Sequence, residues 1–330
     1  MRILELCSGA GGQALGLERA GFEHKGLIEI EKDACDTLTL NRPNWPVYNQ
    51  DLNNVDFREF KGVDLICGGV PCQPFSIAGH QLGHKDERDL FPIAVKAVEK
   101  LKPQAFFFEN VRGLASANFD RYRNFILKEL ISLGYYVEFK VIDSSNYGVP
   151  QLRPRFILVG RRDGNVNFPW PKPQGKIKTV SQTIYDLMNE NSWKQIDQWK
   201  IVADKIAPTV VGGSKKHGGP DLGPTRAKRQ WSEMGVDGNG IANLPPESDF
   251  IGLPKLTNRM VARIQGFPDS WKFSGKKTST YRQIGNAFPP PVAEKVGKSI
   301  VQWLNEKPVK KSNNFSSAFQ QEFFEDLVAL

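Results

Sequence analysis

Short apolar runs separated by amphipathic stretches organise the first 160 residues of the chain. The apolar runs predict strands at 2–6, 25–28, 45–49, 64–68, 104–108, 135–142 and 156–160. Helical spacing of apolar residues between these runs predicts helices at 12–20, 90–101 and 120–133. Strands that alternate with helices are typical of an α/β fold with a mainly parallel sheet. Because such sheets bind ligands at the carboxyl ends of their strands, we expect the functional residues there.

A glycine-rich turn joins the first predicted strand to the first helix. Gly9 and Gly11 allow backbone amides to approach a ligand at the amino terminus of that helix. Glu29 ends the second strand, where a carboxylate can hold the hydroxyls of a ribose. Asp51 follows the third strand and can either accept from an adenine amino group or cap the next segment. The spacing of Gly9, Gly11 and Ala14 also fits a dinucleotide fingerprint, so an NAD-dependent oxidoreductase remains an alternative.

Cys72 follows the fourth strand inside a turn that two prolines make stiff. A stiff loop at a strand end suits a nucleophile, although a free cysteine is often just a small buried residue. Residues 78–89 follow without clear periodicity and are predicted to form a mobile functional loop. Zinc-ligand residue types also occur here, at Cys67, Cys72, His80 and His84. Zinc is disfavoured because Cys67 lies within an apolar strand and the separation from cysteine to histidine is short.

Three charged residues lie next to predicted strands in the second half of this region: Glu109 follows the strand at 104–108, and Arg153 and Arg155 precede the strand at 156–160. Glu109 comes directly after an aromatic strand, where burial would raise its pKa and allow it to donate a proton. The alternative is a glutamate that only pairs with a nearby arginine. Arg153 and Arg155 alternate onto one face of the chain, so their guanidinium groups are expected to converge on a phosphate or a polar carbonyl. Ordinary surface charge is the alternative for these two arginines.

Composition and charge bear on the partner, the location and the cysteine chemistry of the protein, but they do not identify its function. The 330 residues carry 44 Lys and Arg against 36 Asp and Glu, which favours a polyanionic partner without proving one. No apolar run reaches membrane-spanning length and no signal peptide precedes the first strand, so we expect a cytoplasmic protein. All four cysteines lie in the first quarter, which is not typical of a disulfide framework.

Several motifs together resemble the DNA cytosine-C5 methyltransferases of the bacterial restriction-modification type. They occur in the family's order: Cys7-Ser8-Gly9-Ala10-Gly11-Gly12, Glu29-Ile30-Glu31, Pro71-Cys72-Gln73, Glu109-Asn110-Val111, Gln151-Leu152-Arg153-Pro154-Arg155, Arg263-Ile264-Gln265-Gly266-Phe267-Pro268 and Gln283-Ile284-Gly285-Asn286. The resemblance implies a Rossmann-like sheet that binds S-adenosylmethionine, with a small, irregular target-recognition domain. The implied cofactor residues are Ser8, Gly9, Gly11, Gly12, Glu29, Ile30, Asp51, Leu52, Pro71, Leu90 and Asn286. Cys7 departs from the family's usual Phe, so an aromatic contact to the cofactor is missing.

The resemblance also implies a reaction. Cys72 would add to C6 of a cytosine flipped out of double-stranded DNA, and Glu109 would protonate or share a proton with N3. Arg155, with Arg153 behind it, would hold O2. The product would be 5-methylcytosine within a short, palindromic site, made by a monomer that protects host DNA and associates with the nucleoid. No metal is implied. A tRNA methyltransferase of the same family and a catalytically silent DNA-binding protein remain rivals.

The region after Trp170 changes to a Gly-, Pro- and Lys-rich composition without clear periodicity. Candidate DNA contacts there and in the loop after Cys72 are Gln73, Ser76, Lys215, Lys216, Arg226 and Arg229. Helical spacing resumes at 257–265 and again at 290–304. We expect a catalytic and cofactor-binding domain at 1–171, a recognition domain at 172–254, a hinge at 255–280, a return to the catalytic domain at 281–305, and a tail at 306–330.

Overall fold

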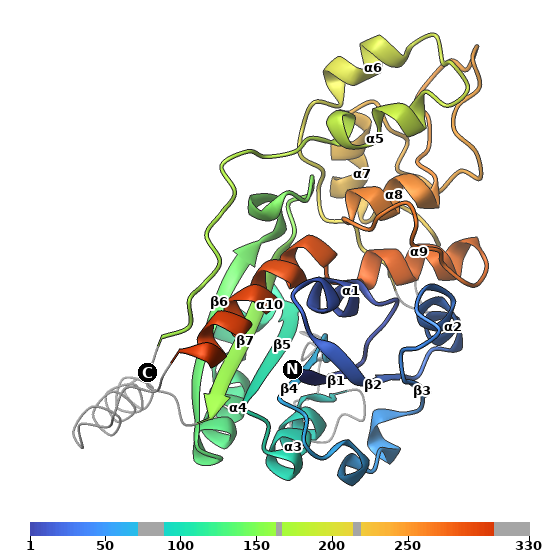
Figure 1. Ribbon diagram of the computed structural model, residues 1–330. Coiled ribbons are helices and arrows are strands. Elements are labelled where there is room, and N and C mark those ends of the chain that lie inside the picture. The colour runs from blue at the N-terminus through green and yellow to red at the C-terminus, as the bar shows by residue number, and fades with distance from the viewer. Residues whose placement is uncertain (72–88, 163–166, 214–218, 307–330) are drawn as a thin grey trace.

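The computed structural model describes residues 1–71, 89–162, 167–213 and 219–306 (Figure 1). A seven-stranded sheet in the order β3-β2-β1-β4-β5-β7-β6 forms the centre of this part of the chain. Its strands are β1 (Arg2–Leu6), β2 (Glu23–Glu29), β3 (Val47–Asn49), β4 (Leu65–Gly68), β5 (Ala105–Val111), β6 (Tyr135–Asp143) and β7 (Pro154–Arg162). Its helices are α1 (Gly12–Arg19), α2 (Lys32–Asn41), α3 (Phe91–Leu101), α4 (Asp120–Ser132) and α10 (Pro290–Asn305). The predicted α/β sheet is confirmed.

Side chains that alternate along the strands supply two apolar cores. Ile3 of β1 packs in the cluster that includes residues of α1 and α10, whereas Leu4 packs in the cluster that includes residues of α3 and α4. Helix α10 lies close against α1, and Gly16 makes this approach possible. A Cβ on Gly16 would lie 2.4 Å from the Cβ of Ala293 and 2.5 Å from the carbonyl oxygen of Pro290. Helix α10, from near the end of the described chain, therefore packs beside the first helix and contributes to the core of the sheet.

Strand β7 departs from the predicted parallel arrangement. It pairs in antiparallel register with both β5 and β6 and points the opposite way in Figure 1. In that register Glu109 is opposite Ile157 and Val111 is opposite Arg155. Glu109 therefore lies inside β5 rather than after it, which corrects the predicted end of that strand. The reversal places the start of β7 beside the carboxyl end of β5.

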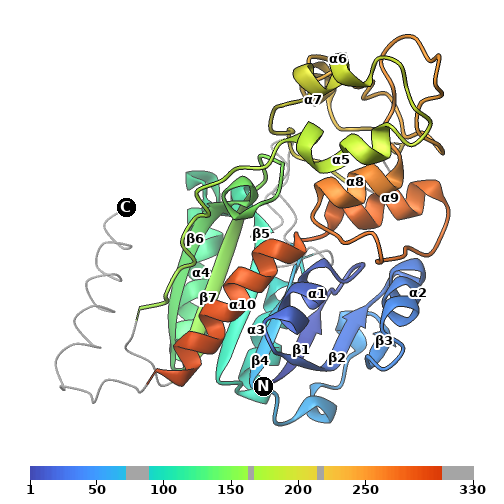
Figure 2. The same ribbon diagram turned by 45° about the horizontal axis from the view of Figure 1, so that its top comes forward.

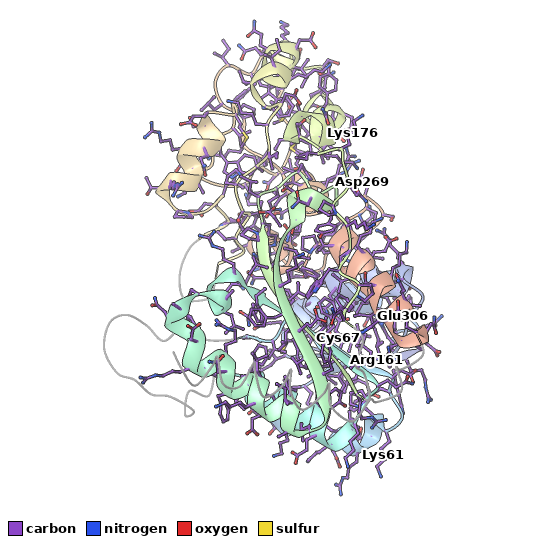
Figure 3. All side chains as sticks on the ribbon, turned by 90° about the vertical axis from the view of Figure 1, so that its left-hand side faces the viewer. Lys61, Cys67, Arg161, Lys176, Asp269 and Glu306 are labelled. Carbon is purple, nitrogen blue, oxygen red and sulfur yellow. The ribbon has the colours of Figure 1, made fainter. Side chains whose placement is uncertain are left out.

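Arg161, near the far end of β7, ties the last helix to the sheet. Its guanidinium donates to the carbonyl oxygens of Trp303 and, at 2.8 Å, of Glu306. Figure 3 shows Arg161 and Glu306 side by side at the end of α10. These bonds satisfy carbonyl groups that the end of a helix leaves without partners.

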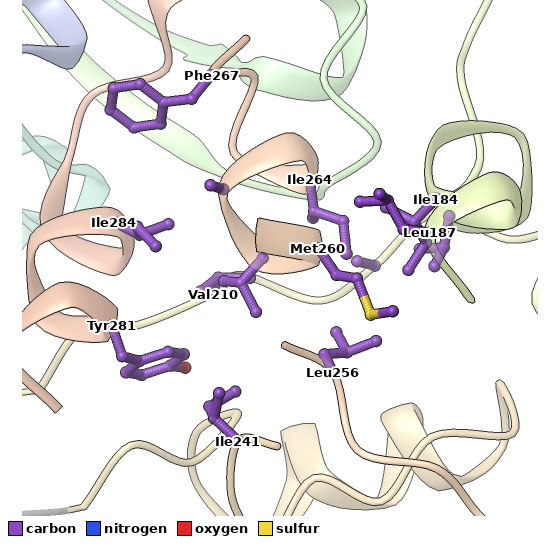
Figure 4. Packing of buried hydrophobic residues seen from close by; sticks show 14 of the residues in the cluster. Ile184, Leu187, Val210, Ile241, Leu256, Met260, Ile264, Phe267, Tyr281 and Ile284 are labelled. Carbon is purple, nitrogen blue, oxygen red and sulfur yellow. The ribbon is translucent and has the colours of Figure 1, made fainter. Parts of the chain in front are cut away.

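Helices α5 to α9 form a second group at the carboxyl ends of the parallel strands (Figures 1 and 2). They are α5 (Val180–Met188), α6 (Ile196–Val202), α7 (Thr225–Ser232), α8 (Asn258–Ile264) and α9 (Lys277–Asn286). Buried residues from all five helices share one apolar cluster, part of which Figure 4 shows around Met260, Ile264 and Tyr281. The sequence predicted α8 but not α5, α6, α7 or α9. No helix within the described ranges is long and apolar enough to span a membrane.

Candidate active site

A cavity of about 300 Å³ follows the carboxyl ends of five neighbouring strands, from β3 to β5. Its wall includes the predicted cofactor residues Ser8, Gly9, Gly12, Glu29, Ile30, Asp51, Leu52, Pro71, Leu90 and Asn286. Glu109 lines the same cavity at its β5 end. The structure therefore brings together almost all the residues that the sequence proposed for the cofactor, and it places a candidate catalytic carboxyl beside them.

Gly11 is the exception among the predicted cofactor residues, because it does not line the cavity. Its backbone has a φ of 84°, and a Cβ there would lie 2.6 Å from Leu38 and 2.9 Å from Trp271. The turn and the packing both require glycine at this position, and a contact of Gly11 with the cofactor stays a prediction. Gly12 does line the cavity, and a Cβ there would meet the carbonyl oxygen of Phe288 at 2.3 Å.

Glu29 holds the glycine turn in shape. Its Oε2 accepts a hydrogen bond from the backbone N–H of Gly9 at 2.7 Å, and its Oε1 accepts from that of Glu31 at 2.8 Å. Burial raises the pKa of the Glu29 carboxyl, while the two backbone donors oppose that rise. Each carboxylate oxygen can still accept a further bond, so a ribose hydroxyl can be held beside the turn.

Apolar and polar groups meet at the β3 end of the cavity. Ile30 is 60% exposed on its rim, while Leu52 is buried in its wall. Asp51 caps the short helix Leu52–Asn54 by accepting from the Asn53 backbone N–H at 2.9 Å. The capping role that the sequence allowed for Asp51 is confirmed, and a contact to adenine stays a prediction. The arrangement suits a flat apolar ring with a polar edge.

Cys7, the departure from the family pattern, also lines the cavity. Its φ of 53° lies in the left-handed region, which is uncommon for a residue other than glycine. Burial and the neighbouring carboxylates raise the pKa of the Cys7 thiol. This thiol is therefore a poor nucleophile and acts as part of the cavity wall.

Pro71 and Leu90 are the cavity residues nearest in sequence to the segment 72–88, which lies outside the described residues. The backbone N–H of Leu90 donates to the carbonyl oxygen of Pro71 at 3.2 Å. The Nδ2 of Asn110, on β5, donates to the carbonyl oxygen of Val70 at 2.8 Å. Asn110 thus fixes the turn after β4 to the neighbouring strand. The predicted residues Cys72, Gln73 and Ser76, and most of the predicted loop 78–89, fall in the undescribed segment.

Glu109 and Arg155 form a buried ion pair at the adjoining ends of β5 and β7. The Nε of Arg155 lies 2.7 Å from Oε1 of Glu109, and each residue is 9% exposed. Burial raises the pKa of the Glu109 carboxyl, against the opposing charges of Arg155 and Arg153. The alternative prediction, that Glu109 pairs with a nearby arginine, is therefore confirmed. The same geometry gives a carboxyl group that is poised to hold a proton at the edge of the cavity.

The guanidinium groups of Arg153 and Arg155 bind different partners and do not converge on one spot, which corrects the sequence prediction. It is 1% exposed, and its guanidinium donates to the carbonyl oxygens of Val210 at 2.6 Å, Gly285 at 2.8 Å and Ala287 at 3.0 Å. These acceptors lie before α7 and at the end of α9. Arg153 therefore joins the sheet domain to the helical group, and it supports the site without facing it.

Two glutamines that the sequence analysis did not single out extend this joint. Gln151 is fully buried; its Nε2 donates to Oε1 of Gln265 at 2.8 Å, and its Oε1 accepts from the backbone N–H of Val210 at 2.8 Å. Gln265 in turn donates to the carbonyl oxygen of Ala287. Because glutamine is polar, residue type alone predicts surface positions for both. Their presence in two of the family motifs was the sequence feature that could have identified them as buried.

The candidate DNA contacts of α7 are exposed on the helical group. Arg229 pairs with Glu233 at 3.3 Å, whereas Arg226 lies on the exposed face of the same helix. Lys215 and Lys216 lie outside the described residues.

Among the residues that the structure covers, no cluster of His, Cys, Asp and Glu could hold a metal ion. Cys67 is fully buried, with its Sγ directed to the carbonyl oxygen of Leu4 at 3.8 Å.

Similarity to solved structures agrees with this architecture. A structure described as a putative DNA modification methyltransferase encoded within a prophage, from E. coli, matches with a TM-score of 0.66 at 25% identity, over 93% of this chain and 100% of that one. The fold of a Spodoptera frugiperda DNMT2 variant matches with a TM-score of 0.64 at 21% identity, over 92% and 99% of the two chains. Together with the glycine turn and the cavity, these matches define a Rossmann-like methyltransferase fold.

The sequence comparisons identify the family. The chain belongs to the C-5 cytosine-specific DNA methylase family, which matches residues 1–302, and it is therefore a DNA cytosine-5 methyltransferase. It is 51% identical over 312 residues to the Type II methyltransferase M.NaeI of Lentzea aerocolonigenes, covering 92% of this chain and 76% of that protein. It is 50% identical over 315 residues to the Type II methyltransferase M.NgoMIV of Neisseria gonorrhoeae, covering 94% and 98%. The resemblance stated from the motifs is confirmed.

Proposed function

We propose that this enzyme transfers a methyl group from S-adenosylmethionine to C5 of a cytosine flipped out of double-stranded DNA, through a covalent adduct between Cys72 and C6. The observation that carries the proposal is the continuous cavity, which joins the glycine turn and Glu29 to the buried Glu109. A target base must leave the duplex because a stacked cytosine cannot reach a buried carboxyl. The enzyme would act as a cytoplasmic monomer on a short, palindromic site and protect host DNA, associated with the nucleoid.

The residues of the cavity fit the cofactor. The apolar rim at Ile30 and Leu52 suits an adenine ring, Glu29 suits the ribose hydroxyls, and backbone groups of the Ser8–Gly12 turn approach the methionine part. Pro71 and Asn286 would border the reacting end. Bound there, S-adenosylmethionine would supply an electrophilic methyl group to the site.

The chain's own side chains would prepare the cytosine. The thiolate of Cys72 would form a bond to C6, which breaks the C5–C6 double bond and makes C5 nucleophilic. Glu109 would donate to or share a proton with N3, so that negative charge does not build up on the ring. Arg155 is fixed by Glu109 and by the carbonyl oxygen of Pro154, and its Nη2 would hold O2. After C5 accepts the methyl group, loss of the C5 proton to water or hydroxide would expel Cys72 as thiolate.

A covalent trap tests the proposal. Bisulfite sequencing of DNA from cells that express the enzyme would first define the methylated site. Duplex DNA carrying 5-fluorocytosine at that cytosine should then form a denaturant-resistant adduct, because fluorine blocks the loss that releases Cys72. We expect Cys72→Ser to form no adduct and Cys35→Ser, the matched control at another free cysteine, to form it normally. An adduct with Cys72→Ser would remove Cys72 from the mechanism.

The proton donor is tested separately. Glu109→Gln keeps the size of the side chain but cannot transfer a proton to N3, so single-turnover methylation should slow by about 10²–10⁴ while DNA binding is retained. Unchanged single-turnover rates would contradict the acid role of Glu109.

A further inference from the structure

Helix α7 is anchored on one face and carries arginines on another. Ala227 and Trp231 are buried, and Trp231 belongs to the apolar cluster that the helical group shares. Arg226, Arg229 and Glu233 lie on a separate, exposed face of the helix. A rigid surface that presents two guanidinium groups to solvent suits a polyanion, and the polyanion on which a DNA methyltransferase acts is DNA.

Glu233 orients the side chain of Arg229. The Nε of Arg229 lies 3.3 Å from Oε1 of Glu233, one helical turn further on, and the two side chains are 84% and 58% exposed. An ion pair this exposed adds little to stability, but it restricts the directions that the arginine can take. Because the contact uses Nε, the two Nη groups can still donate to a pair of neighbouring acceptors. Guanine presents such a pair, N7 and O6, in the major groove.

Asp221 connects α7 to α9 and, through α9, to the cavity. Its Oδ2 lies 2.8 Å from Nζ of Lys228 on α7, and its carbonyl oxygen accepts a hydrogen bond from the Tyr281 hydroxyl on α9. Tyr281 is 1% exposed, and Asn286 at the end of the same helix lines the cavity. These contacts fix the position of α7 relative to the cavity. A side chain that reads a base needs such a fixed position, because the base that is read and the base that is methylated are a set distance apart along the DNA.

We propose that α7 lies in the major groove of the bound DNA, where Arg229, oriented by Glu233, reads a guanine and Arg226 contacts a phosphate. The major groove admits an α-helix, whereas the minor groove is too narrow for one. The residue one turn after Arg226 is the uncharged Gln230, so Arg226 has no carboxylate in the equivalent position. A phosphate contact positions the protein and does not require the fixed fork that a base edge requires. The inference rests on the proposed action on double-stranded DNA and names a residue that selects the site.

Binding of modified duplexes to the whole enzyme, measured without turnover, tests the inference. Bisulfite sequencing first defines the methylated site, and each guanine of the site is then replaced in turn by 7-deazaguanine, which keeps base pairing but lacks N7. We expect one replacement to weaken wild-type binding by about fivefold or more and to have no further effect on Arg229→Met. Arg226→Met is the matched control on the same helix. It should weaken all duplexes by one common factor and keep the wild-type response to that replacement.

The outcomes separate the inference from the proposed function. If the wild-type enzyme methylates the unmodified duplex but Arg229→Met responds to every replacement as the wild type does, the inference is overturned and the proposed function stands. A wild-type enzyme that is insensitive to all the replacements also overturns the inference, as does a loss of the response in Arg226→Met. If the wild-type enzyme neither binds nor methylates duplex DNA, the proposed function fails, and the inference with it.

A second variant keeps the test decisive. Glu233→Gln removes the charge that orients Arg229, so it should lose part of the response to the same 7-deazaguanine and keep its affinity for unrelated duplex DNA. Thermal melts identify any variant that does not fold. If Arg229→Met is one of them, Glu233→Gln decides in its place, and a full wild-type response from it overturns the inference.

Discussion

Replacing Arg153 separates a structural role from a catalytic one. Arg153→Met keeps much of the aliphatic volume but leaves the carbonyl oxygens of Val210 and Gly285 without their side-chain donor, while that of Ala287 still accepts from Gln265. A buried acceptor without a partner costs about 1–3 kcal/mol. Burial also lowers the pKa of Arg153, which reflects the cost of keeping this cation away from water. That cost disappears with the guanidinium and offsets part of the loss from the two unpaired carbonyl oxygens, so we expect a destabilisation of about 2–4 kcal/mol.

Urea unfolding at pH 7 measures this effect, and Arg155→Lys is the control from the same motif. Arg155 bonds to Glu109 and to its own neighbour Pro154, so Arg155→Lys should cost only about 1 kcal/mol of stability. It should nevertheless reduce adduct formation with 5-fluorocytosine DNA strongly. An Arg153→Met protein that unfolds at the wild-type urea concentration but forms no adduct would refute the structural role. Arg153 would then have to contact the substrate itself.

Three further predictions concern other parts of the molecule. His24 is buried with both ring nitrogens unpaired among the described residues, and burial lowers its pKa from 6.5 to about 4. Because the unfolded chain takes up this proton first, stability should fall by about 2 kcal/mol between pH 7 and pH 5, and His24→Phe should flatten that part of the urea-unfolding profile. Gly285→Ala would place a Cβ 2.4 Å from the backbone nitrogen of Gly212, so we expect a loss of about 1–3 kcal/mol in the same assay; an unchanged midpoint would contradict the close packing. Arg226→Ala should lower the salt slope of DNA binding by about one unit, and an unchanged slope would exclude a phosphate contact for Arg226.

The large domain was predictable because its signals are strong and local. Each apolar run of the sheet stops at glycine or a polar residue, and the predicted strands at 2–6 and 135–142 correspond closely to β1 and β6. The direction of β7 was not predictable, since alternation along a strand carries no information about which way it runs. The end of β5 was misplaced for a related reason: Glu109 and Asn110 are polar, yet both are buried within the strand.

The helical group was missed because its elements are short or polar. Helix α6 buries only Ile196 and Trp199, and α7 buries only Ala227 and Trp231, so neither shows a continuous apolar stripe. Their stability comes from the shared apolar cluster rather than from local preference. The domain limits proposed from composition stay predictions. The residues proposed for the cofactor were identified through ordered motifs, and all of them except Gly11 line one cavity.

The reversal of β7 has a consequence for how such an enzyme can change its target. Arg155 lies on β7 and Glu109 on β5, and these two strands are hydrogen-bonded neighbours in the sheet. Both side chains are therefore positioned by paired strands rather than by a loop. Their spacing is set by backbone pairing that the helices α5 to α7 do not share. Substitutions in those helices can therefore leave the spacing of Glu109 and Arg155 unchanged. On the proposed roles of the helical group and of this pair, the DNA sequence that is read can change without rebuilding the site of the reaction.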